Sequence, residues 1–589
     1  MRRHVRGYPV VPLVLFVLFS LFALPAPPVR AARVPPLPLE RLYDNTAVSD
    51  DARPDSADLD GRGASLSAGD LAAAGWTPGR ALTVQGARLT WPRRAAGAPD
   101  NVRAQGQAVR LTGRGDALAF LATGTGGDAA GGAGTVGYAD GSRSSYRLAV
   151  PDWRQGSLAA KAVALPHVNT RDGQLAEKAR LYVTTVPLDR GREVAWVELP
   201  VDPELHVFAL TVRAARPGWT GSWATATSGL RTVGPWTDRT LRLVVHTSAG
   251  GPRVRLRFDN TFASLPVRLG GATVAVRAEG ATAAERPARL SFDGAPGVEL
   301  PAGAQAVSDP LAFPVPAGAD LLVSVHLPGP VTAAPLHGFA LQRSYLSGPG
   351  DHTADAAGTA YAPTLTTWPL LTGVDVGGGP GTVVLFGDSI TDGDGSTVDA
   401  DRRWPDALAD RLRRQDAVPR YGVLNQGIAG NRVLVDRYPG DGALPTVGAG
   451  VSALSRLDRD VFAQTSVRTV VVLEGINDLL LGASGEQVIE GLREIAERAR
   501  LRGVRVLGAT LLPCGGTARC TPAVDAERAA VNVWIRQAGA FDGVLDADRA
   551  LRDPFAPTRM LPAYDSGDHL HPGDAGYAAL AEAVDLRLL

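Results

Sequence analysis

The run Thr382-Val383-Val384-Leu385-Phe386 is followed directly by Gly387-Asp388-Ser389-Ile390. An apolar run of this length predicts a buried parallel strand, and Gly387 predicts a sharp turn at its end. Ser389 would then lie just past the carboxyl end of a strand, where open α/β sheets bind their ligands. An isolated Gly-Asp-Ser can equally be the start of a helix with Asp or Ser as its cap. The sequence on either side decides between these interpretations.

From residue 381 onward, apolar runs of strand length alternate with stretches of helical periodicity. Repeated alternation of this kind predicts a parallel sheet with helices on both faces. The expected strands are 382–386, 421–425, 468–474, 504–510 and 542–547. The expected helices are about 403–415, 451–465, 486–502, 523–539 and 574–587.

Three further polar stretches occur in this part of the chain, two of them directly after expected strands and one near its end: Asn425-Gln426-Gly427-Ile428-Ala429-Gly430-Asn431, Glu474-Gly475-Ile476-Asn477-Asp478, and Asp565-Ser566-Gly567-Asp568-His569-Leu570-His571-Pro572. Together with the Gly-Asp-Ser stretch, and in this order, they resemble the four sequence blocks of the SGNH/GDSL hydrolase (esterase/lipase) family. The resemblance covers about 376–589 and extends to Arg403-Trp404-Pro405-Asp406. It implies a flavodoxin-like α/β/α three-layer domain that hydrolyses carboxylic esters.

The resemblance also implies a role for each block. Ser389 would be the nucleophile, His571 its general base, and Asp568 the residue that orients the imidazole, because a serine hydroxyl needs a neighbouring base to become reactive. The oxyanion hole would consist of the backbone N–H groups of Ser389 and Gly430 and the side-chain amide of Asn477. Asp388 and Asp478 are expected to hold turns and loops. No metal and no other cofactor is implied.

Two alternatives stay open from the residues alone. This domain contains only two histidines, His569 and His571, and Asp565 with His569 has a spacing that would also serve as an acid–base pair. Gly427 competes with Gly430 for the place in the oxyanion hole. Spacing does not separate either pair of candidates.

The N-terminus predicts a signal peptide over 1–31. Three arginines precede an apolar stretch from Val10 to Leu24, and Val29 and Ala31 provide small residues for a cut after Ala31. The mature protein would therefore be secreted, with 32–40 as a Pro-rich linker. An uncleaved anchor is the alternative. Cys514 and Cys520, the only cysteines, are expected to pair in an exported protein.

Two β-rich regions, 41–215 and 216–375, precede the hydrolase region, and short strands separated by turn clusters predict β-sandwiches. The first resembles accessory modules of secreted glycoside-active enzymes. The second resembles the β domain that precedes this hydrolase in some bacterial two-domain members. His246 and His326 have no acidic or cysteine partner at useful spacing, so they are expected to be structural. Residues 375–380 are expected to form a hinge.

These observations predict a secreted serine esterase that acts through an acyl-enzyme, with acyl or acetyl groups on glycans as one candidate substrate. An acyltransferase with the same site is an alternative. Another is a carbohydrate- or surface-binding protein with a vestigial hydrolase domain, in which Trp153 or Trp223 stacks on sugars if it is exposed. Lys+Arg and Asp+Glu are both 60, and this balance argues against a nucleic-acid partner.

Overall fold

The computed structural model describes residues 35–437 and 449–589. The expected signal peptide, 1–31, and the first residues of the expected linker lie outside the described residues. Among the helices of the described part, none is both long enough and apolar enough to cross a bilayer.

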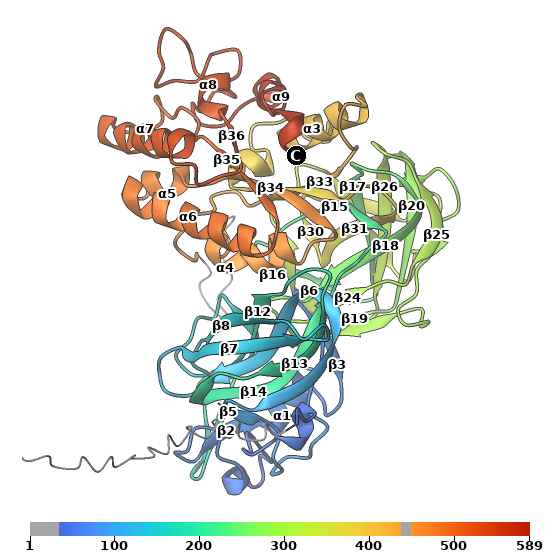
Figure 1. Cartoon of the computed structure of the whole chain (residues 1–589). Helices are drawn as coiled ribbons and strands as arrows, with labels where there is room; N and C mark the ends of the chain where they lie inside the picture. Colours follow the sequence, from blue (N-terminus) through green and yellow to red (C-terminus); the bar gives the residue numbers. More distant parts are fainter. Residues whose placement is uncertain (1–34, 438–448) are drawn as a thin grey trace, which may run out of the picture. The chain divides into compact units, whose positions relative to one another are not determined.

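The first region, up to Ala214, consists almost entirely of strands (Figure 1). One sheet has the order β5-β14-β6-β13-β7-β8, with β12 and β9 added through β6, and a smaller sheet has the order β1-β2-β10-β11. One short α-helix, α1 (Ala68–Ala73), and two 3-10 turns, Leu39–Arg41 and Pro54–Ser56, accompany the strands in the described part of this region. The strands are β1 (Val48–Ser49), β2 (Ala64–Ser67), β3 (Ala81–Val84), β4 (Ala87–Thr90), β5 (Val102–Gln105), β6 (Ala108–Gly124), β7 (Ala130–Tyr138), β8 (Arg143–Val150), β9 (Lys161–Leu165), β10 (Val168–Thr170), β11 (Gly173–Leu175), β12 (Ala179–Pro187), β13 (Glu193–Glu198) and β14 (Val201–Ala214).

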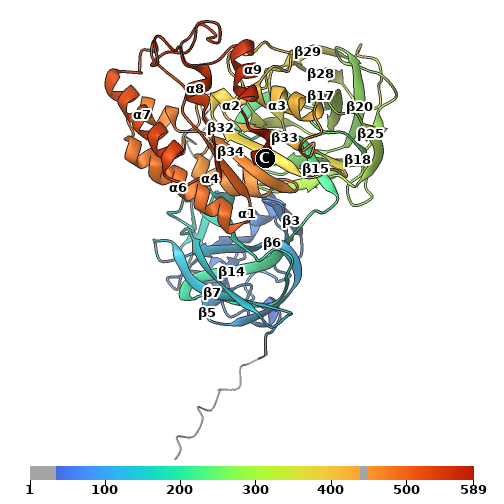
Figure 2. The same cartoon turned by 45° about the horizontal axis from the view of Figure 1, so that its top comes forward.

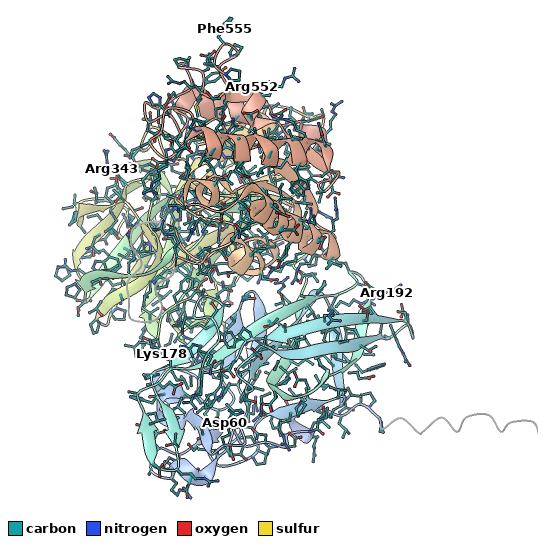
Figure 3. All side chains as sticks on the ribbon, turned by 90° about the vertical axis from the view of Figure 1, so that its left-hand side faces the viewer. Asp60, Lys178, Arg192, Arg343, Arg552 and Phe555 are labelled. Atoms are coloured by element: carbon teal, nitrogen blue, oxygen red, sulfur yellow. A yellow bond between two sulfur atoms is a disulfide. The ribbon has the colours of Figure 1, made fainter. Side chains whose placement is uncertain are left out.

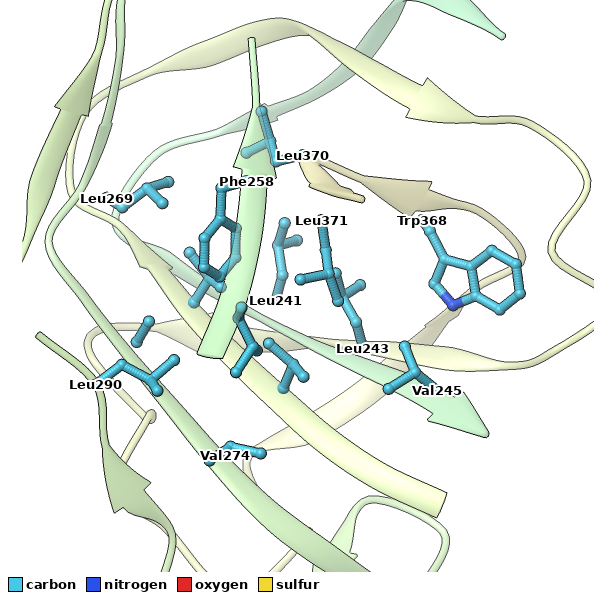
Figure 4. Packing of buried hydrophobic residues seen from close by; sticks show 14 of the residues in the cluster. Leu241, Leu243, Val245, Phe258, Leu269, Val274, Leu290, Trp368, Leu370 and Leu371 are labelled. Carbon is cyan, nitrogen blue, oxygen red and sulfur yellow. The ribbon is translucent and has the colours of Figure 1, made fainter. Parts of the chain in front are cut away.

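The second region is also built from strands, and two of its sheets face each other across an apolar core (Figure 4). Leu241 and Leu243 from β17 pack with Phe258 from β18 and Leu371 from β31. The strands are β15 (Trp219–Ala224), β16 (Gly229–Trp236), β17 (Arg239–His246), β18 (Gly251–Asp259), β19 (Val267–Leu269), β20 (Gly271–Glu279), β21 (Thr282–Ala283), β22 (Ala288–Arg289), β23 (Val298–Leu300), β24 (Gln305–Val307), β25 (Leu311–Val315), β26 (Asp320–Leu327), β27 (Val331–His337), β28 (Ser344–Pro349), β29 (Tyr361–Leu365), β30 (Trp368–Pro369) and β31 (Leu371–Gly377).

One expectation for this region is wrong, and a second is extended by the structure. Asp375, expected in a hinge, lies in β31, is fully buried, and accepts hydrogen bonds from Arg255 and Thr465. His246 and His326 do have acidic partners, because the sheet brings in aspartates that are distant in sequence: Asp320 lies 2.9 Å from His246, and Asp238 lies 2.9 Å from His326. Both histidines are therefore satisfied by contacts that spacing could not reveal.

The third region is an open parallel sheet with the order β33-β32-β34-β35-β36, and helices cover both of its faces (Figure 2). The predicted α/β fold and the multidomain architecture are confirmed. The strands are β32 (Thr382–Gly387), β33 (Gly422–Gly427), β34 (Val467–Leu473), β35 (Arg505–Ala509) and β36 (Gly543–Leu545). The helices are α2 (Ser389–Asp392), α3 (Trp404–Arg413), α4 (Ala453–Leu457), α5 (Ile476–Leu480), α6 (Gly485–Leu501), α7 (Pro522–Gln537), α8 (Ala547–Leu551) and α9 (Asp574–Glu582), with a π-helical turn at Asp458–Phe462.

Alternation along β32 explains why helices cover both faces. Val384 and Phe386 pack into one apolar cluster, with α4, α6 and α7, whereas Val383 and Leu385 pack into the other, with α3 and α9. Successive side chains of a strand point to opposite faces, so a run that is apolar throughout can be stable only when both faces are covered. The carboxyl ends of the strands are thereby placed at one edge, which carries the polar stretches.

A shared sheet and side-chain hydrogen bonds join the first region to the other two. The hairpin of β3 and β4 extends a sheet of the second region, with Thr83 paired to Gln305. Asp458, at the start of the π-helical turn, accepts a hydrogen bond from the Thr185 hydroxyl at 2.7 Å. Arg502 donates to the Thr185 hydroxyl oxygen at 2.7 Å and to the same carboxylate at 2.5 Å. These contacts connect the first region to the other two.

Candidate active site

Ser389 is the first residue of α2, immediately after β32 and its turn. Asp388 caps the helix, because its side chain accepts the N–H of Ile390 at 3.0 Å. Gly387 is required at the end of the strand, since a Cβ there would overlap the Thr391 hydroxyl. The strand–turn–helix sequence therefore holds the Ser389 hydroxyl at the carboxyl edge of the sheet. Residue Ser389 as a whole is 5% exposed.

The His571 imidazole joins Ser389 to Asp568. Its Nε2 lies 2.8 Å from Ser389 Oγ, and its Nδ1 lies 2.5 Å from Asp568 Oδ2. The other oxygen of Asp568 accepts the backbone N–H groups of Leu570 and His571 at 2.9 and 2.8 Å. Burial opposes the charged form of Asp568, but these donors outweigh it and hold its pKa below the ordinary value. An ionised Asp568 accepts from Nδ1–H, which leaves Nε2 as the acceptor for the serine hydroxyl.

The second aspartate–histidine pair, left open by the sequence, also forms but is directed elsewhere. His569 Nδ1 lies 2.7 Å from Asp565 Oδ2, and the His569 side chain is 51% exposed. The same carboxylate accepts the backbone N–H of Gly567. His569 makes no hydrogen bond to Ser389 within the described ranges. Both pairs lie in the long connection from α8 to α9, whose outer part projects with Phe555 exposed (Figure 3).

The expected oxyanion donors differ in whether their N–H groups already donate hydrogen bonds within the protein. Within 35–437 and 449–589, the backbone N–H groups of Ser389 and Gly430 have no protein acceptor. The N–H of Gly427 donates to Asn425 Oδ1 at 2.9 Å, so Gly427 is unsuited to the role. The Asn477 amide donates to the Asn431 carbonyl at 3.0 Å and lies 3.4 Å from Asp388 Oδ2. Its second contact is long, so one hydrogen is only weakly bound.

Comparison with protein families identifies two parts of the chain. The model of the GDSL-like lipase/acylhydrolase family matches residues 385–579. Residues 385–579 are a GDSL hydrolase domain. The model of the AziU2-like β-sandwich domain matches residues 33–216. No curated protein matches the chain significantly.

Solved structures similar to the GDSL domain include one named TesA, which is 23% identical and for which the alignment covers 35% of this chain and 99% of that one, with a TM-score of 0.26. A GDSL-like lipase from Bacteroides thetaiotaomicron is 18% identical over 35% and 87%, with a TM-score of 0.26. A catalytic mutant of Axe2, an acetylxylan esterase from Geobacillus stearothermophilus, is 18% identical over 34% and 91%, with a TM-score of 0.27.

Beneath the GDSL site lies a buried acidic group that the sequence analysis did not identify as one unit. Burial raises the pKa of Asp388 to about 7, and burial together with the nearby Asp388 raises that of Glu474 well above its ordinary value. Arg456 is the cation among them: it donates to Glu474 at 3.2 Å and to the Gly387 carbonyl at 2.8 Å. It also donates to Asn431 Oδ1 at 2.9 Å.

Arg456 therefore ties together three segments of the GDSL site: the end of β32, the turn after β33 and the end of β34. It lies in a helical stretch that also contains Arg459, and no local signal distinguishes the two. Asp478 has the role that the sequence predicts, because its carboxylate accepts the N–H groups of Val433 and Leu434 at 2.7 and 3.1 Å. Arg456 and Asp478 thus hold loops in place, and neither makes a hydrogen bond to Ser389 in the described structure.

Two groups of metal-binding residue types come close together in the described part of the chain. One contains Cys514 and Cys520, which form the expected disulfide. In the other, His246 contacts Asp320 and Asp401, and Arg277 already binds Asp320 at 2.9 Å. These partners occupy the donor atoms that a metal would need.

The tryptophans suggested for sugar stacking are not available for it. Trp153 is 1% exposed and Trp223 is 5% exposed. A buried indole packs in the core and cannot offer its face to a glycan. Trp153 and Trp223 therefore belong to the core.

Proposed function

We propose that the protein is a serine esterase that hydrolyses carboxylic esters through an acyl-enzyme. The observation that carries the proposal is the contact of 2.8 Å between His571 Nε2 and Ser389 Oγ, in a ring whose other nitrogen faces Asp568. A nucleophile, a base within hydrogen-bond reach and an orienting carboxylate are what acyl transfer to a serine requires.

In the first half of the reaction, Ser389 Oγ attacks the ester carbonyl while its proton passes to His571 Nε2. The imidazolium is stabilised by Asp568 and then gives the proton to the departing alcohol. In the second half, His571 takes a proton from water as the water attacks the acyl-enzyme, and it returns the proton to Ser389 Oγ as the acid is released. Asp568 keeps its charge throughout, in accord with the lowered pKa.

Three hydrogen-bond donors stabilise the negative charge that develops on the carbonyl oxygen. The N–H groups of Ser389 and Gly430 have no competing acceptor among the described residues, so they can bind the oxyanion without giving up another bond. Gly430 has φ of +74°, a conformation that favours glycine and turns the backbone at this point. Asn477 contributes its weakly bound amide hydrogen. Loss of one such donor costs about 3–4 kcal/mol in the transition state.

The substrate is proposed as an acyl ester of a glycan, and the protein as secreted. The support for secretion is the N-terminal pattern of residues 1–31, and the support for a glycan is the presence of β-sandwich regions ahead of the hydrolase domain. Fold-level analogy of this kind indicates a class of substrate and no more. Small acyl esters are the simpler substrates with which to begin.

The test is a panel of acetylated glycans and p-nitrophenyl esters of short to long acyl chains, with wild type and Ser389→Ala in parallel. We expect Ser389→Ala to lose at least about 10⁴-fold in kcat on every ester that the wild type hydrolyses. Its circular dichroism spectrum should be unchanged. Retention of activity in the pure variant would refute the assignment of the nucleophile.

The same residues would serve an acyltransferase, in which a sugar hydroxyl replaces water in the second half. The two activities are separated by comparing free acid and acylated sugar with and without a sugar acceptor. Release of acid at the same rate in both cases supports the hydrolase. Formation of acylated sugar at the expense of acid supports the transferase.

A further inference from the structure

His337 is the last residue of β27, in the second region, and its imidazole is buried against the GDSL domain. Its Nδ1 lies 2.8 Å from the carbonyl oxygen of Ala226. Its Nε2 lies 3.1 Å from the carbonyl oxygen of Phe339 and 2.9 Å from Asp392 Oδ1. The side chains of His337 and Asp392 are only 2% and 3% exposed. The contact is therefore shielded from water.

Both nitrogens of the His337 ring face acceptors alone. A neutral imidazole carries one N–H, so it would leave the lone pair of its other nitrogen against an oxygen. Burial disfavours protonation, but the Asp392 carboxylate and the acceptors on both nitrogens outweigh burial and raise the pKa of His337. The pair is accordingly an imidazolium and a carboxylate in contact within the protein interior.

The other oxygen of Asp392 reaches the active site. Asp392 Oδ2 accepts the N–H of Ala429 at 2.8 Å, and Ala429 immediately precedes Gly430. Asp392 itself lies in α2, the short helix that begins with Ser389. One carboxylate thus fixes the loop of the proposed oxyanion donor to the helix of the proposed nucleophile. The direction of that carboxylate is set by His337, its cationic partner.

We propose that His337 is a positioning residue of the esterase site: it orients the Asp392 carboxylate, which holds Ala429 and so places the N–H of Gly430. This inference rests on the proposed function. It makes residues 216–375 a part of the active site, supplied from outside the hydrolase domain, and not a module that can be removed without effect on the chemistry.

The chain offers a matched control at His246, the last residue of β17. Its Nδ1 lies 2.9 Å from Asp320 and 3.3 Å from Asp401, which belongs to the loop before α3. The contact with Asp401 is thus a histidine–aspartate contact between the same two regions. It involves neither α2 nor the loop of Ala429. Loss of His246 should weaken the connection of the regions and leave the oxyanion loop in place.

The experiment measures kcat and KM of the full chain on an ester that the wild type hydrolyses, for His337→Gln, Asp392→Asn and His246→Gln. We expect His337→Gln and Asp392→Asn each to lower kcat by about 10- to 100-fold, the range known for residues that orient metal ligands from behind. KM should stay within about threefold, because the lost contact acts in the transition state. His246→Gln should keep kcat within about twofold of wild type.

A double variant tests whether His337 and Asp392 act on kcat as one unit. With His337→Gln and Asp392→Asn together, two neutral amides can bond to each other and leave no unpaired buried charge. Their combined loss in kcat should therefore be smaller than the product of the single losses. A simple product would count against the proposal.

Wild-type kcat in folded His337→Gln overturns the inference, and so does an equal loss of kcat in His246→Gln, which would indicate general loosening of the regions. If His337→Gln does not fold, as judged by near-UV circular dichroism, Asp392→Asn decides by the same criterion. Failure of the proposed function is distinct: it shows as activity in Ser389→Ala, or as no turnover by the wild type. An inactive Ser389→Ala with full kcat in His337→Gln rejects the positioning role alone.

Discussion

Two aspartate–histidine pairs in the connection from α8 to α9 are equivalent in composition but not in position. Asp565 and His569 are in contact at 2.7 Å, and Asp568 and His571 at 2.5 Å. The His569 side chain is 51% exposed, whereas that of His571 is 13% exposed and has Ser389 on its free nitrogen. Spacing along the chain is enough to make such a pair. Only the direction of the second ring nitrogen, toward the edge of the sheet, gives it a nucleophile to activate.

The largest effect expected from this comparison separates the two histidines. His571→Ala should lower kcat by at least about 10⁴-fold, because no other described group accepts the Ser389 proton at hydrogen-bond distance. His569→Ala should stay within about threefold of wild type, since its ring contacts Asp565 and packs near Gly516. Turnover of a p-nitrophenyl ester measures both. Equal losses in the two variants would contradict the assignment of the base.

Substitution of the two partner aspartates, Asp568 and Asp565, should also affect kcat unequally, with a smaller loss than for His571→Ala. Asp568→Asn should lower kcat by about 10³- to 10⁴-fold, because an amide no longer holds the imidazole in the required tautomer or stabilises its charge. Asp565→Asn should change kcat by no more than about threefold. If Asp565→Asn proved the more damaging to kcat, the orienting carboxylate would have to be reassigned.

The fold of this domain could be read from sequence because each of its strands is a short apolar run bounded by polar turns. The expected strand 382–386 differs by one residue at its end from β32 (Thr382–Gly387), and the expected helix 486–502 is shifted by one residue at both ends from α6 (Gly485–Leu501). The expected helix 451–465 is divided, since a π-helical turn follows α4. Local pattern thus predicts which elements form, and their ends depend on contacts that the pattern does not contain.

The contacts that the sequence did not reveal join residues far apart in the chain. His337 lies 55 positions from Asp392, and His246 lies 74 positions from Asp320. Arg456 joins backbone and side-chain groups of three different segments. Nothing local marks any of these residues, because their roles come from the packing of one element against another. The catalytic candidates, by contrast, stand at strand ends within recognisable blocks.

The smallest expected effect concerns the free energy of unfolding. Here substitution of Asp565 should cost more than substitution of Asp568, the reverse of their order in kcat. The Asp565 side chain is 11% exposed and that of Asp568 is 51% exposed, so solvent screens Asp568 more strongly. Burial opposes the charge of Asp565, but the N–H of Gly567 and the His569 ring outweigh it and lower its pKa. Asp565→Asn should therefore cost about 1–2 kcal/mol in the free energy of unfolding at pH 7, and Asp568→Asn should cost less.

The pH dependence of that loss follows from the sign of the shift. A carboxyl whose pKa is lower in the folded than in the unfolded chain stabilises the fold above its unfolded value, about 3.9, and stops doing so as the pH falls through its folded value. Urea unfolding of wild type and Asp565→Asn at pH 7, 5, 4 and 3 measures this contribution. The difference between them should shrink below about pH 4. A difference that does not change with pH would mean that the charge of Asp565 contributes nothing to stability. The pair of Asp565 and His569 would then be a neutral contact, unlike the pair of Asp568 and His571, which reaches Ser389.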